Sequence, residues 1–376
     1  MDKKNVRILT VGTFFLFSNV GSFLQHWALR DVLKDLGFIP SRVKRQNDET
    51  LYCINDTVWI KSIIKQFVKV LLHQIGIRKY SGFTCNIRSF RQYIQARLYK
   101  RDYTRFIGPC IESEHKEDNI LVLGGDQVFC EYLLKLSQTV KSKKRIIYGA
   151  SCDWPNSFPN NTLTEEISQR ITLFNKVGVR EDYGRNILTQ NGFLAQWVAD
   201  PVMLVGRDKL IQISSRKEIL SRPTLFCYLL NIKEEQSIPY EELLTLSKKL
   251  NVGLKMHGTQ GGELFIPSKY FLPLGPCDFL KTIINAEYVI TNSYHGTLLS
   301  AIFHKPFISI KQHDQNIRQS ELLKMIGLDD NLIQFDELPK RACKLLRKNY
   351  NWDCVDKKME ELRRTSIIWL KESLSH

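Results

Sequence analysis

Apolar runs of strand length alternate with helical patterns along most of the chain. The first run, residues 6–11, precedes a helical pattern over residues 22–36 that ends at Gly37. Helical stretches such as 241–250 and 297–303 separate later runs. These later runs form two series: 120–123, 145–150, 177–179 and 196–199, and then 224–230, 252–256, 288–291 and 306–310. The alternation predicts an α/β protein with mostly parallel sheets.

The chain has 376 residues, more than one hydrophobic core usually organises, so we expect two domains. A polar stretch over residues 206–223 separates the two series of strands. The predicted domains are therefore residues 1–205 and 206–345. The remaining residues, 346–376, contain a helical pattern over 353–374 with apolar residues along one side.

Small or polar residues follow almost every predicted strand. Because ligands of open α/β sheets bind beyond the carboxyl ends of the strands, the pattern predicts a cleft served by both sheets. Tight turns alone explain many glycines, asparagines and serines, but they do not require Arg180, His257 or His295. The strand-end residues that we take as candidates are Gly124, Gly125, Asp126, Ser151, Arg180, His257, Asn292, Ser293, His295, Gly296 and Thr297.

His295 is the candidate with the most versatile chemistry. It lies between a predicted strand and a predicted helix, where free backbone N–H groups favour an anion. The reference pKa of histidine is about 6.5, so this side chain can act as acid, base or anion ligand. A purely structural histidine in the turn is the alternative. No GxSxG sequence occurs, which argues against a serine hydrolase.

Other common site patterns are absent from the sequence. Neither GxxxxGK[ST] nor GxGxxG occurs, although the stretch with Asn19, Gly21 and Ser22 has the composition to cradle a phosphate or a sugar. No zinc-finger or RNA-binding pattern indicates nucleic acid. Nine scattered cysteines without a CxxC pair are typical of reduced thiols in a cytoplasmic protein and predict no structural zinc.

Charge is unevenly distributed along the chain. The net charge is +15, and residues 57–110 contain eleven Lys or Arg against a single acid, Asp102. Within this insertion, residues 58–75 have the pattern of a basic amphipathic helix with aromatic residues on its other face. Such a helix binds an acidic membrane surface or a lipid diphosphate, or it packs on the protein with a solvated lysine stripe. No apolar run reaches the roughly 18 residues of a spanning helix.

Several of these stretches together resemble the polysaccharide pyruvyl transferase family. The segment Asn19-Val20-Gly21-Ser22-Phe23-Leu24-Gln25 is similar to the family's NYGAxLQ opening, and Gly124 to Phe129 is similar to its GSDQVW segment. Shorter matches are Tyr148 to Ser151, Val179-Arg180-Glu181, Ala199-Asp200-Pro201 and Asn316-Ile317-Arg318. The most specific match is ITNSYHGTLLSAIFHKPFI, residues 290–308.

The sequence also departs from the family pattern. Gly125 stands where Ser is common, Phe129 replaces Trp, and Ser22 replaces Ala. Some members carry Arg at the position of Ser293, two residues before His295, so another cation must take its place. Residues 14–17 are bulky and apolar where the family is typically polar, which leaves the acceptor sugar unspecified.

The resemblance implies two Rossmann-like domains facing across a cleft, as in GT-B glycosyltransferases, with the C-terminal helix crossing back to the first domain. It also implies transfer of a pyruvyl group from phosphoenolpyruvate to a sugar as a ketal, without a metal or another cofactor, in surface polysaccharide synthesis. We expect the sugar acceptor to be lipid-linked or nucleotide-linked. We also expect the enzyme to work in the cytoplasm, at the inner membrane face if residues 57–110 bind acidic lipid. Alternatives are a GT-B glycosyltransferase that uses a nucleotide sugar, and a non-catalytic scaffold of a polysaccharide assembly complex.

On this reading, Arg180 and Arg318 bind the carboxylate and phosphate of the donor substrate, because guanidinium groups match both. His295 is the expected acid–base catalyst, and Asp126 is the second candidate. We see no metal site, since Asp126, Glu181 and Asp200 are spread over separate loops. The remaining substrate-binding candidates are Asn19, Gly21, Ser22, Gly124, Gly125, Ser151, His257, Asn292, Ser293, Gly296 and Thr297.

Overall fold

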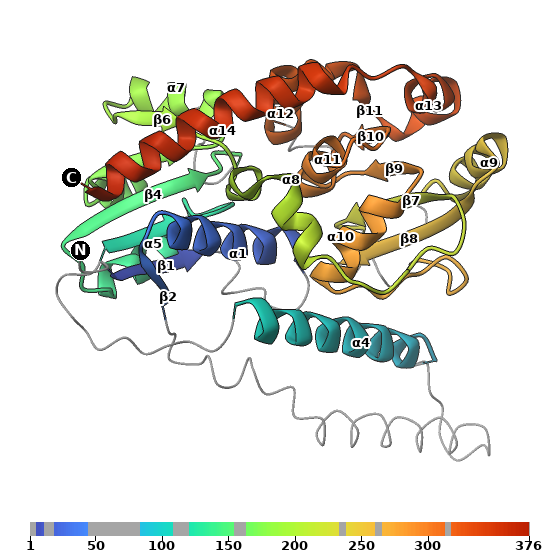
Figure 1. Cartoon of the computed structure of the whole chain (residues 1–376), viewed down its shortest axis with the longest axis horizontal. Coiled ribbons are helices and arrows are strands. Elements are labelled where there is room, and N and C mark those ends of the chain that lie inside the picture. Colours follow the sequence, from blue (N-terminus) through green and yellow to red (C-terminus); the bar gives the residue numbers. More distant parts are fainter. Residues whose placement is uncertain are drawn as a thin grey trace, which may run out of the picture.

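The computed structural model describes residues 5–10, 19–43, 83–107, 120–153, 163–232, 238–259, 265–312 and 317–375. These residues form two parallel sheets, each flanked by helices (Figure 1). The first sheet has the strand order β2-β1-β3-β4-β5-β6, and the second has the order β11-β10-β9-β7-β8. Two Rossmann-like halves of this kind confirm the predicted fold class.

The first sheet and its helices extend from the N-terminal strand to the connection with the second sheet. Its strands are β1 (Asn5–Thr10), β2 (Ile39–Arg42), β3 (Ile120–Gly124), β4 (Lys144–Ala150), β5 (Lys176–Val179) and β6 (Ala195–Trp197). The helices in this part of the chain are α1 (Val20–Asp35), α4 (Phe83–Phe106), α5 (Glu131–Thr139), α6 (Glu165–Ile171), α7 (Asp182–Gln190) and α8 (Pro201–Ile213).

The second sheet follows α8. Its strands are β7 (Thr224–Leu230), β8 (Gly253–Thr259), β9 (Tyr288–Thr291), β10 (Phe307–Ile310) and β11 (Leu332–Ile333). Its helices are α9 (Tyr240–Leu250), α10 (Pro276–Asn285), α11 (Tyr294–Ile302), α12 (Ile317–Ile326) and α13 (Leu338–Arg347), followed by α14 (Trp352–Ser375). Two short 3-10 turns, Asp329–Asn331 and Phe335–Glu337, flank β11.

All nine predicted strands are present, and their ends differ from the predicted ends by three residues at most. Two strands were missed, because β2 and β11 are short edge strands of four and two residues without a long apolar run. The polar stretch at 206–223 lies between β6 and β7, as the prediction has it, and its first part is helical. Helix α8 continues to Ile213, with a kink at Gly206, whose φ of 76° suits glycine.

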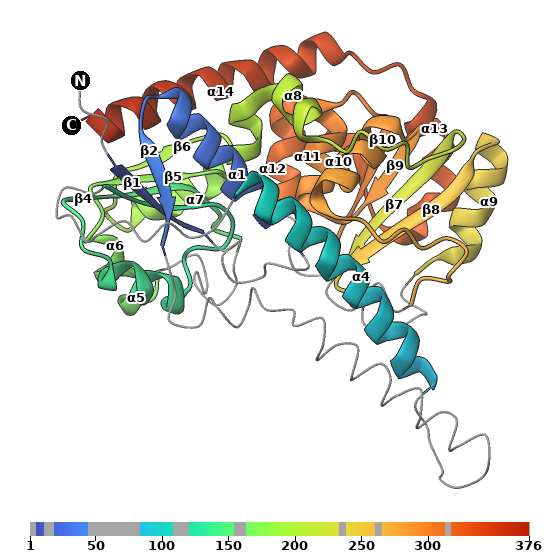
Figure 2. The ribbon, with the colours of Figure 1, turned by 60° about the horizontal axis from the view of Figure 1, so that its bottom comes forward.

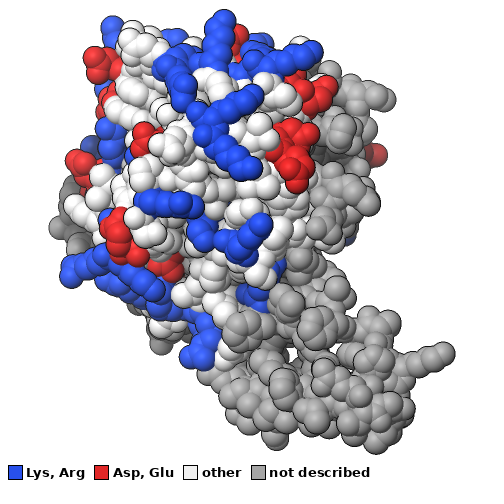
Figure 3. Space-filling model, turned by 90° about the vertical axis from the view of Figure 1, so that its right-hand side faces the viewer, with Lys and Arg blue, Asp and Glu red and all other residues white. Residues whose placement is uncertain are grey.

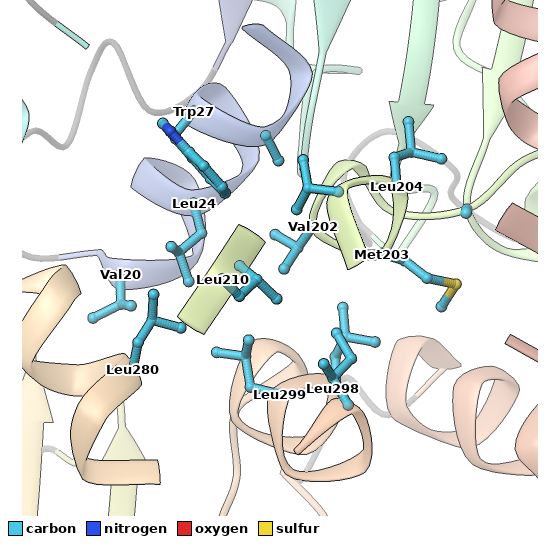
Figure 4. Close-up of a cluster of buried hydrophobic side chains, with 14 of the residues drawn as sticks. Val20, Leu24, Trp27, Val202, Met203, Leu204, Leu210, Leu280, Leu298 and Leu299 are labelled. Carbon is cyan, nitrogen blue, oxygen red and sulfur yellow. The ribbon is translucent and has the colours of Figure 1, made fainter. Parts of the chain in front are cut away.

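A shared hydrophobic core joins the two halves of the molecule. Helix α1 is buried on all sides over its first ten residues, which is typical of a helix enclosed by protein. Figure 4 shows how its side chains meet those of α8, α10 and α11 in one cluster. The labelled members are Val20, Leu24, Trp27, Val202, Met203, Leu204, Leu210, Leu280, Leu298 and Leu299.

Helix α4 follows a strand of the first sheet in sequence but packs on the second half (Figure 2). Its Asp102 accepts a hydrogen bond from the backbone N–H of Cys277 in the first turn of α10 (2.9 Å), and Arg101 pairs with Asp278 (2.9 Å). Gln95 donates to the carbonyl of Gly258 at the end of β8 (3.2 Å). The basic segment of residues 57–110 thus contributes α4, which covers part of the second sheet.

Helix α14 runs along both halves on another side of the molecule (Figure 1). At its start, Trp352 stacks on His304 with ring centroids 5.0 Å apart. Towards its end, Ser366 accepts a hydrogen bond from the backbone of Ala199 (2.7 Å), and Trp369 lies against Gly178 and Tyr148 of the first sheet.

None of the helices in the described ranges is long and apolar enough to cross a bilayer. The predicted basic helix at 58–75 lies outside the described residues, as do residues 14–17 and Asn316. Membrane binding by this insertion therefore stays a prediction.

Candidate active site

A buried guanidinium organises the carboxyl ends of the first sheet. Arg180, directly after β5, pairs through Nη2 with Asp126 (2.6 Å), through Nη1 with Asp200 (2.8 Å) and through Nε with Glu181 (3.0 Å). Its side chain is 0% exposed, and the ring of Tyr294 lies 4.3 Å from its central carbon. Asp126, Glu181 and Asp200 follow three separate strands, as predicted. They nevertheless meet at Arg180, because the parallel strands of one sheet have their carboxyl ends at the same edge.

A second guanidinium enters the cluster from the other half of the molecule. Arg318, in the first turn of α12, pairs through Nη1 with Asp126 (3.0 Å) and through Nε with Asp153 (3.0 Å). Both arginines use the same oxygen of Asp126, Oδ1. The described cluster therefore contains two guanidinium groups and four carboxylates, those of Asp126, Asp153, Glu181 and Asp200.

Burial and the arginines act in opposite directions on these carboxylates. Burial disfavours the charge of Asp126, but Arg180, Arg318 and His295 outweigh it and hold the pKa of Asp126 below its usual value. For Glu181, burial is the stronger effect, and its pKa is raised despite the contact with Arg180. Asp126 is thus an ionised carboxylate, whereas Glu181 binds a proton more readily than an exposed glutamate does.

His295 lies where the prediction put it, in the first turn of a helix after a strand. Ser293 caps α11 by accepting a hydrogen bond from the backbone of Gly296 (3.4 Å). The Nε2 atom of His295 is 3.6 Å from Oδ2 of Asp200, and it is buried with no hydrogen bond in the described part of the chain. The pKa of Asp200 is lowered, because His295 and Arg180 outweigh the effect of its burial.

The first turn of α1 packs against the other side of the imidazole. Asn19 caps this helix by accepting a hydrogen bond from the backbone of Ser22 (3.2 Å). A Cβ atom added to Gly21 would lie only 2.1 Å from Nδ1 of His295, so only glycine allows this approach. Two helix N-termini, one from each half, therefore meet at His295. The positive ends of the two helix dipoles favour an anion there.

Other predicted residues build the framework around His295. Asn292 bonds both the N–H (2.7 Å) and the carbonyl (2.9 Å) of Leu230 with its side chain. Thr297 donates to the carbonyl of Ser293 (3.0 Å), and Gly296 packs against Thr291. Since these groups already have partners inside the protein, they hold the turn in place. Any direct contact of theirs with a substrate stays a prediction.

Gly124, the last residue of β3, and Gly125 also have a structural role. A side chain on Gly124 would clash with Leu29 of α1, and Gly125 has a φ of +80°. The backbone of Ser151 donates to the carbonyl of Asp126 (2.8 Å), and the Ser151 hydroxyl accepts from the backbone of Asp153 (3.3 Å). These residues fix where the carboxylates of Asp126 and Asp153 lie.

His257 is separate from the charged cluster. It is 0% exposed, stacks on Tyr228 with centroids 5.6 Å apart, and donates from Nδ1 to the carbonyl of Leu272 (2.9 Å). Helix α4 places Gln95 beside its other nitrogen. Burial lowers the pKa of His257 to about 4, so the ring is neutral. The structure thus gives His257 a place in the core under α4 instead of the predicted position in an open cleft.

Four members of the site were not among the candidate residues chosen from the sequence: Gln25, Asp153, Glu181 and Asp200. Gln25 of α1 donates to Asp200 (2.7 Å) and accepts from the backbone of Asp126 (3.3 Å), which ties α1 to the carboxylates. Asp153 pairs with Arg318, and Asp200 approaches His295. Asp200 follows a predicted strand directly and was recognisable on that ground. Gln25 is part of the stretch that resembles the family's opening, whereas nothing in the sequence distinguished Asp153.

Comparison with protein families gives one match that covers most of the chain. The family model described as polysaccharide pyruvyl transferase matches residues 19–314. This range includes Asn19, Asp126, Arg180 and His295. No curated protein matches the chain.

Solved structures with a similar fold include two that were determined with UDP bound. UDP-GlcNAc 2-epimerase of Methanocaldococcus jannaschii, solved with UDP-GlcNAc and UDP, has a TM-score of 0.51 and 14% identity, covering 96% of this chain and 99% of the epimerase. The S. aureus MnaA–UDP structure has a TM-score of 0.53 and 11% identity, covering 99% and 97%. At such low identity the likeness shows the fold alone, which is of the GT-B type.

Proposed function

The chain belongs to the polysaccharide pyruvyl transferase family, and on that premise we propose that it transfers the pyruvyl group of phosphoenolpyruvate to two hydroxyls of a sugar. The product is a ketal in a surface polysaccharide. The observation that carries the proposal is the position of His295, between an anion-attracting pair of helix N-termini and a cluster with more carboxylates than guanidinium groups.

The donor substrate binds to the positively charged groups of the site, which are the first turns of α1 and α11 and the guanidinium of Arg318. Phosphoenolpyruvate carries a phosphate and a carboxylate, both of which suit the first turns of α1 and α11 and a guanidinium group. Arg318 is 16% exposed and is accessible to the donor, whereas Arg180 is 0% exposed and is held by three carboxylates. Arg180 therefore orders the carboxylates, in place of the direct donor contact expected from the sequence.

The chemistry requires one proton to move to carbon and two carbon–oxygen bonds to form. Protonated His295 gives its proton to the methylene carbon of phosphoenolpyruvate, which becomes a methyl group and leaves a cationic carbon beside the carboxylate. One sugar hydroxyl attacks this carbon and returns its proton to His295. The second hydroxyl then replaces the phosphate, which departs as hydrogen phosphate with that hydroxyl's proton. Asp126 is the alternative acceptor of a hydroxyl proton.

The excess of carboxylates suits the cationic intermediate. Fixed negative groups aimed at a developing positive charge lower the barrier without reorganising during the reaction. Asp200 is one of these fixed negative groups, with Oδ2 lying 3.6 Å from Nε2 of His295.

A nucleotide-sugar glycosyltransferase is the second candidate, because neighbours of the same fold were solved with UDP. The position of α4 argues against it. Gln95 and Asp102 tie α4 to β8 and α10, so the helix covers part of the carboxyl edge of the second sheet, where a ligand of that sheet would bind.

Membrane contact forms a further part of the proposal. Residues 57–110 are strongly basic, and the described part of α4 exposes Arg97, Arg101 and Arg105. Lys and Arg also predominate over Asp and Glu on the end of the molecule that carries α9 and α13 (Figure 3). These groups suit an acidic membrane surface that carries a lipid-linked acceptor.

Incubation with candidate donors tests the function directly. Phosphoenolpyruvate and a panel of nucleotide sugars are offered separately with sugar acceptors that have neighbouring hydroxyls, and release of phosphate or nucleotide is followed. We expect phosphate release from phosphoenolpyruvate together with a new ketal methyl group. Nucleotide release would favour the glycosyltransferase, and no release with any pair would favour a non-catalytic scaffold.

A further inference from the structure

The two arginines of the site differ in their freedom to change partners. Arg180 is enclosed by three carboxylates and the ring of Tyr294, with no exposed side-chain surface. Arg318 has two carboxylate partners, both at 3.0 Å, and keeps 16% of its side-chain surface exposed. An anion that enters the site can therefore reach the guanidinium of Arg318 but not that of Arg180.

Helix α12 does not depend on Arg318 for its position. Gln319 donates to the carbonyl of Asn292 (3.0 Å), and Glu321 accepts from the backbone of Tyr183 in the first turn of α7 (3.2 Å). Buried apolar residues of α12 add further packing. Arg318 can thus exchange partners by side-chain rotation alone, while the helix stays fixed to both halves.

We propose that Arg318 is the exchangeable anion ligand of the site, and that Asp153 sets the affinity for the anionic donor by competing for it. The inference rests on the proposed function in taking phosphoenolpyruvate as that donor. The phosphate takes the place of Asp153 at Nε of Arg318, since phosphate and carboxylate oxygens both accept charge-assisted hydrogen bonds from a guanidinium. The ion pair between Asp126 and Arg180 stays in place during this exchange.

Asp153 opposes donor binding in two ways. Its carboxylate occupies Nε of Arg318, and its side chain is only 4% exposed, so water screens its charge poorly from an incoming anion. The backbone of Asp153 is held independently, because its N–H donates to the hydroxyl of Ser151. Asparagine at this position keeps the size and an acceptor oxygen but loses the charge.

The test measures binding of phosphoenolpyruvate and of inorganic phosphate to Asp153→Asn by calorimetry. We expect the Kd of both anions to fall roughly two- to five-fold, the effect of a partly exposed ion pair. Asp182→Asn is the matched control, because it removes the same charge from a carboxylate that pairs with Arg185 on the protein surface. The control should leave both Kd values unchanged.

The Arg318→Gln variant shows whether Asp153 changes the anion Kd by acting on Arg318. The single variant should raise both Kd values by roughly an order of magnitude, the loss expected for a charge-assisted contact. In the double variant, the gain from Asp153→Asn should be clearly smaller, because the competed group is absent and only the repulsion between Asp153 and the anion is relieved. An unchanged or higher Kd in Asp153→Asn, or an equal gain with and without Arg318, would overturn the proposal.

Comparing the binding of inorganic phosphate with that of phosphoenolpyruvate tests this inference separately from the proposed function. If inorganic phosphate shows the predicted pattern but phosphoenolpyruvate does not bind, then the exchange at Arg318 is correct and the proposed donor is wrong. If neither anion binds to the wild-type protein, then Arg318 is not an anion ligand and the inference fails.

Discussion

Gly21→Ala places a methyl group against the proposed catalytic histidine without altering any charged residue. The added Cβ would lie 2.1 Å from Nδ1 of His295, whereas an ordinary contact begins at 3.4 Å. The ring must therefore withdraw by about 1.3 Å, or α1 must shift by a similar distance. Misplacement of a catalytic group by about 1 Å costs on the order of 100-fold in rate, so we expect turnover to fall by about that factor.

The effect of Gly21→Ala on the free energy of unfolding should change sign when the imidazole of His295 is removed. Overpacking costs about 1–3 kcal/mol, and alanine favours a helix over glycine by up to about 1 kcal/mol, so the net destabilisation should be modest. In a His295→Ala background the contact is absent, and Gly21→Ala should stabilise the protein. Ser22→Ala is the control, because it changes the same helical turn without adding an atom near the ring.

Urea unfolding of the two single variants and the double variant measures the coupling between Gly21 and His295. NMR signals of the His295 ring report its displacement independently of activity. Equal destabilisation by Gly21→Ala with and without the imidazole, together with unshifted ring signals, would refute the contact and the reasoning built on it.

Three further predictions follow from the same structure. Arg180→Ala should lower the free energy of unfolding by about 3–5 kcal/mol, because three buried carboxylates lose their shared cation, and an unchanged urea midpoint would contradict this. His257 has a pKa lowered from 6.5 to about 4, so the folded state binds fewer protons than the unfolded state between these values. Stability should therefore fall by about 3 kcal/mol as the pH drops through this window, and His257→Gln should flatten the slope seen in thermal unfolding at several pH values. If residues 57–110 bind acidic lipid, the protein should sediment with anionic vesicles and not with neutral ones, and equal recovery would exclude that role.

The strands were predictable because apolar runs of strand length are a local signal, and β2 and β11 escaped because they are short. The order of strands in the sheet is not local. Nothing in the sequence says that the residues after β3, β5 and β6 meet, so the gathering of Asp126, Glu181 and Asp200 around Arg180 was not foreseen. His295 was found because a strand, a capping serine and a helix surround it within a few residues.

Long-range packing explains the other differences. Arg101 and Asp278 are 177 residues apart in sequence, and their contact is part of what seats α4 on the second half of the molecule. His257 was predicted to face a cleft because it follows an apolar run, but α4 covers that strand end. The close approach of Gly21 to His295 likewise joins two distant segments through the shared core.

The central claim is that His295 moves the proton in ketal formation, and His295→Gln tests it most directly. Glutamine keeps a polar side chain that can donate and accept hydrogen bonds, but it cannot transfer a proton at neutral pH. With phosphoenolpyruvate and an accepted sugar, turnover should fall by a factor on the order of 10² to 10⁴, while donor affinity and melting temperature stay close to wild type. Near-normal turnover of the glutamine variant would contradict the account, reduce His295 to an anion ligand and transfer the catalytic assignment to Asp126.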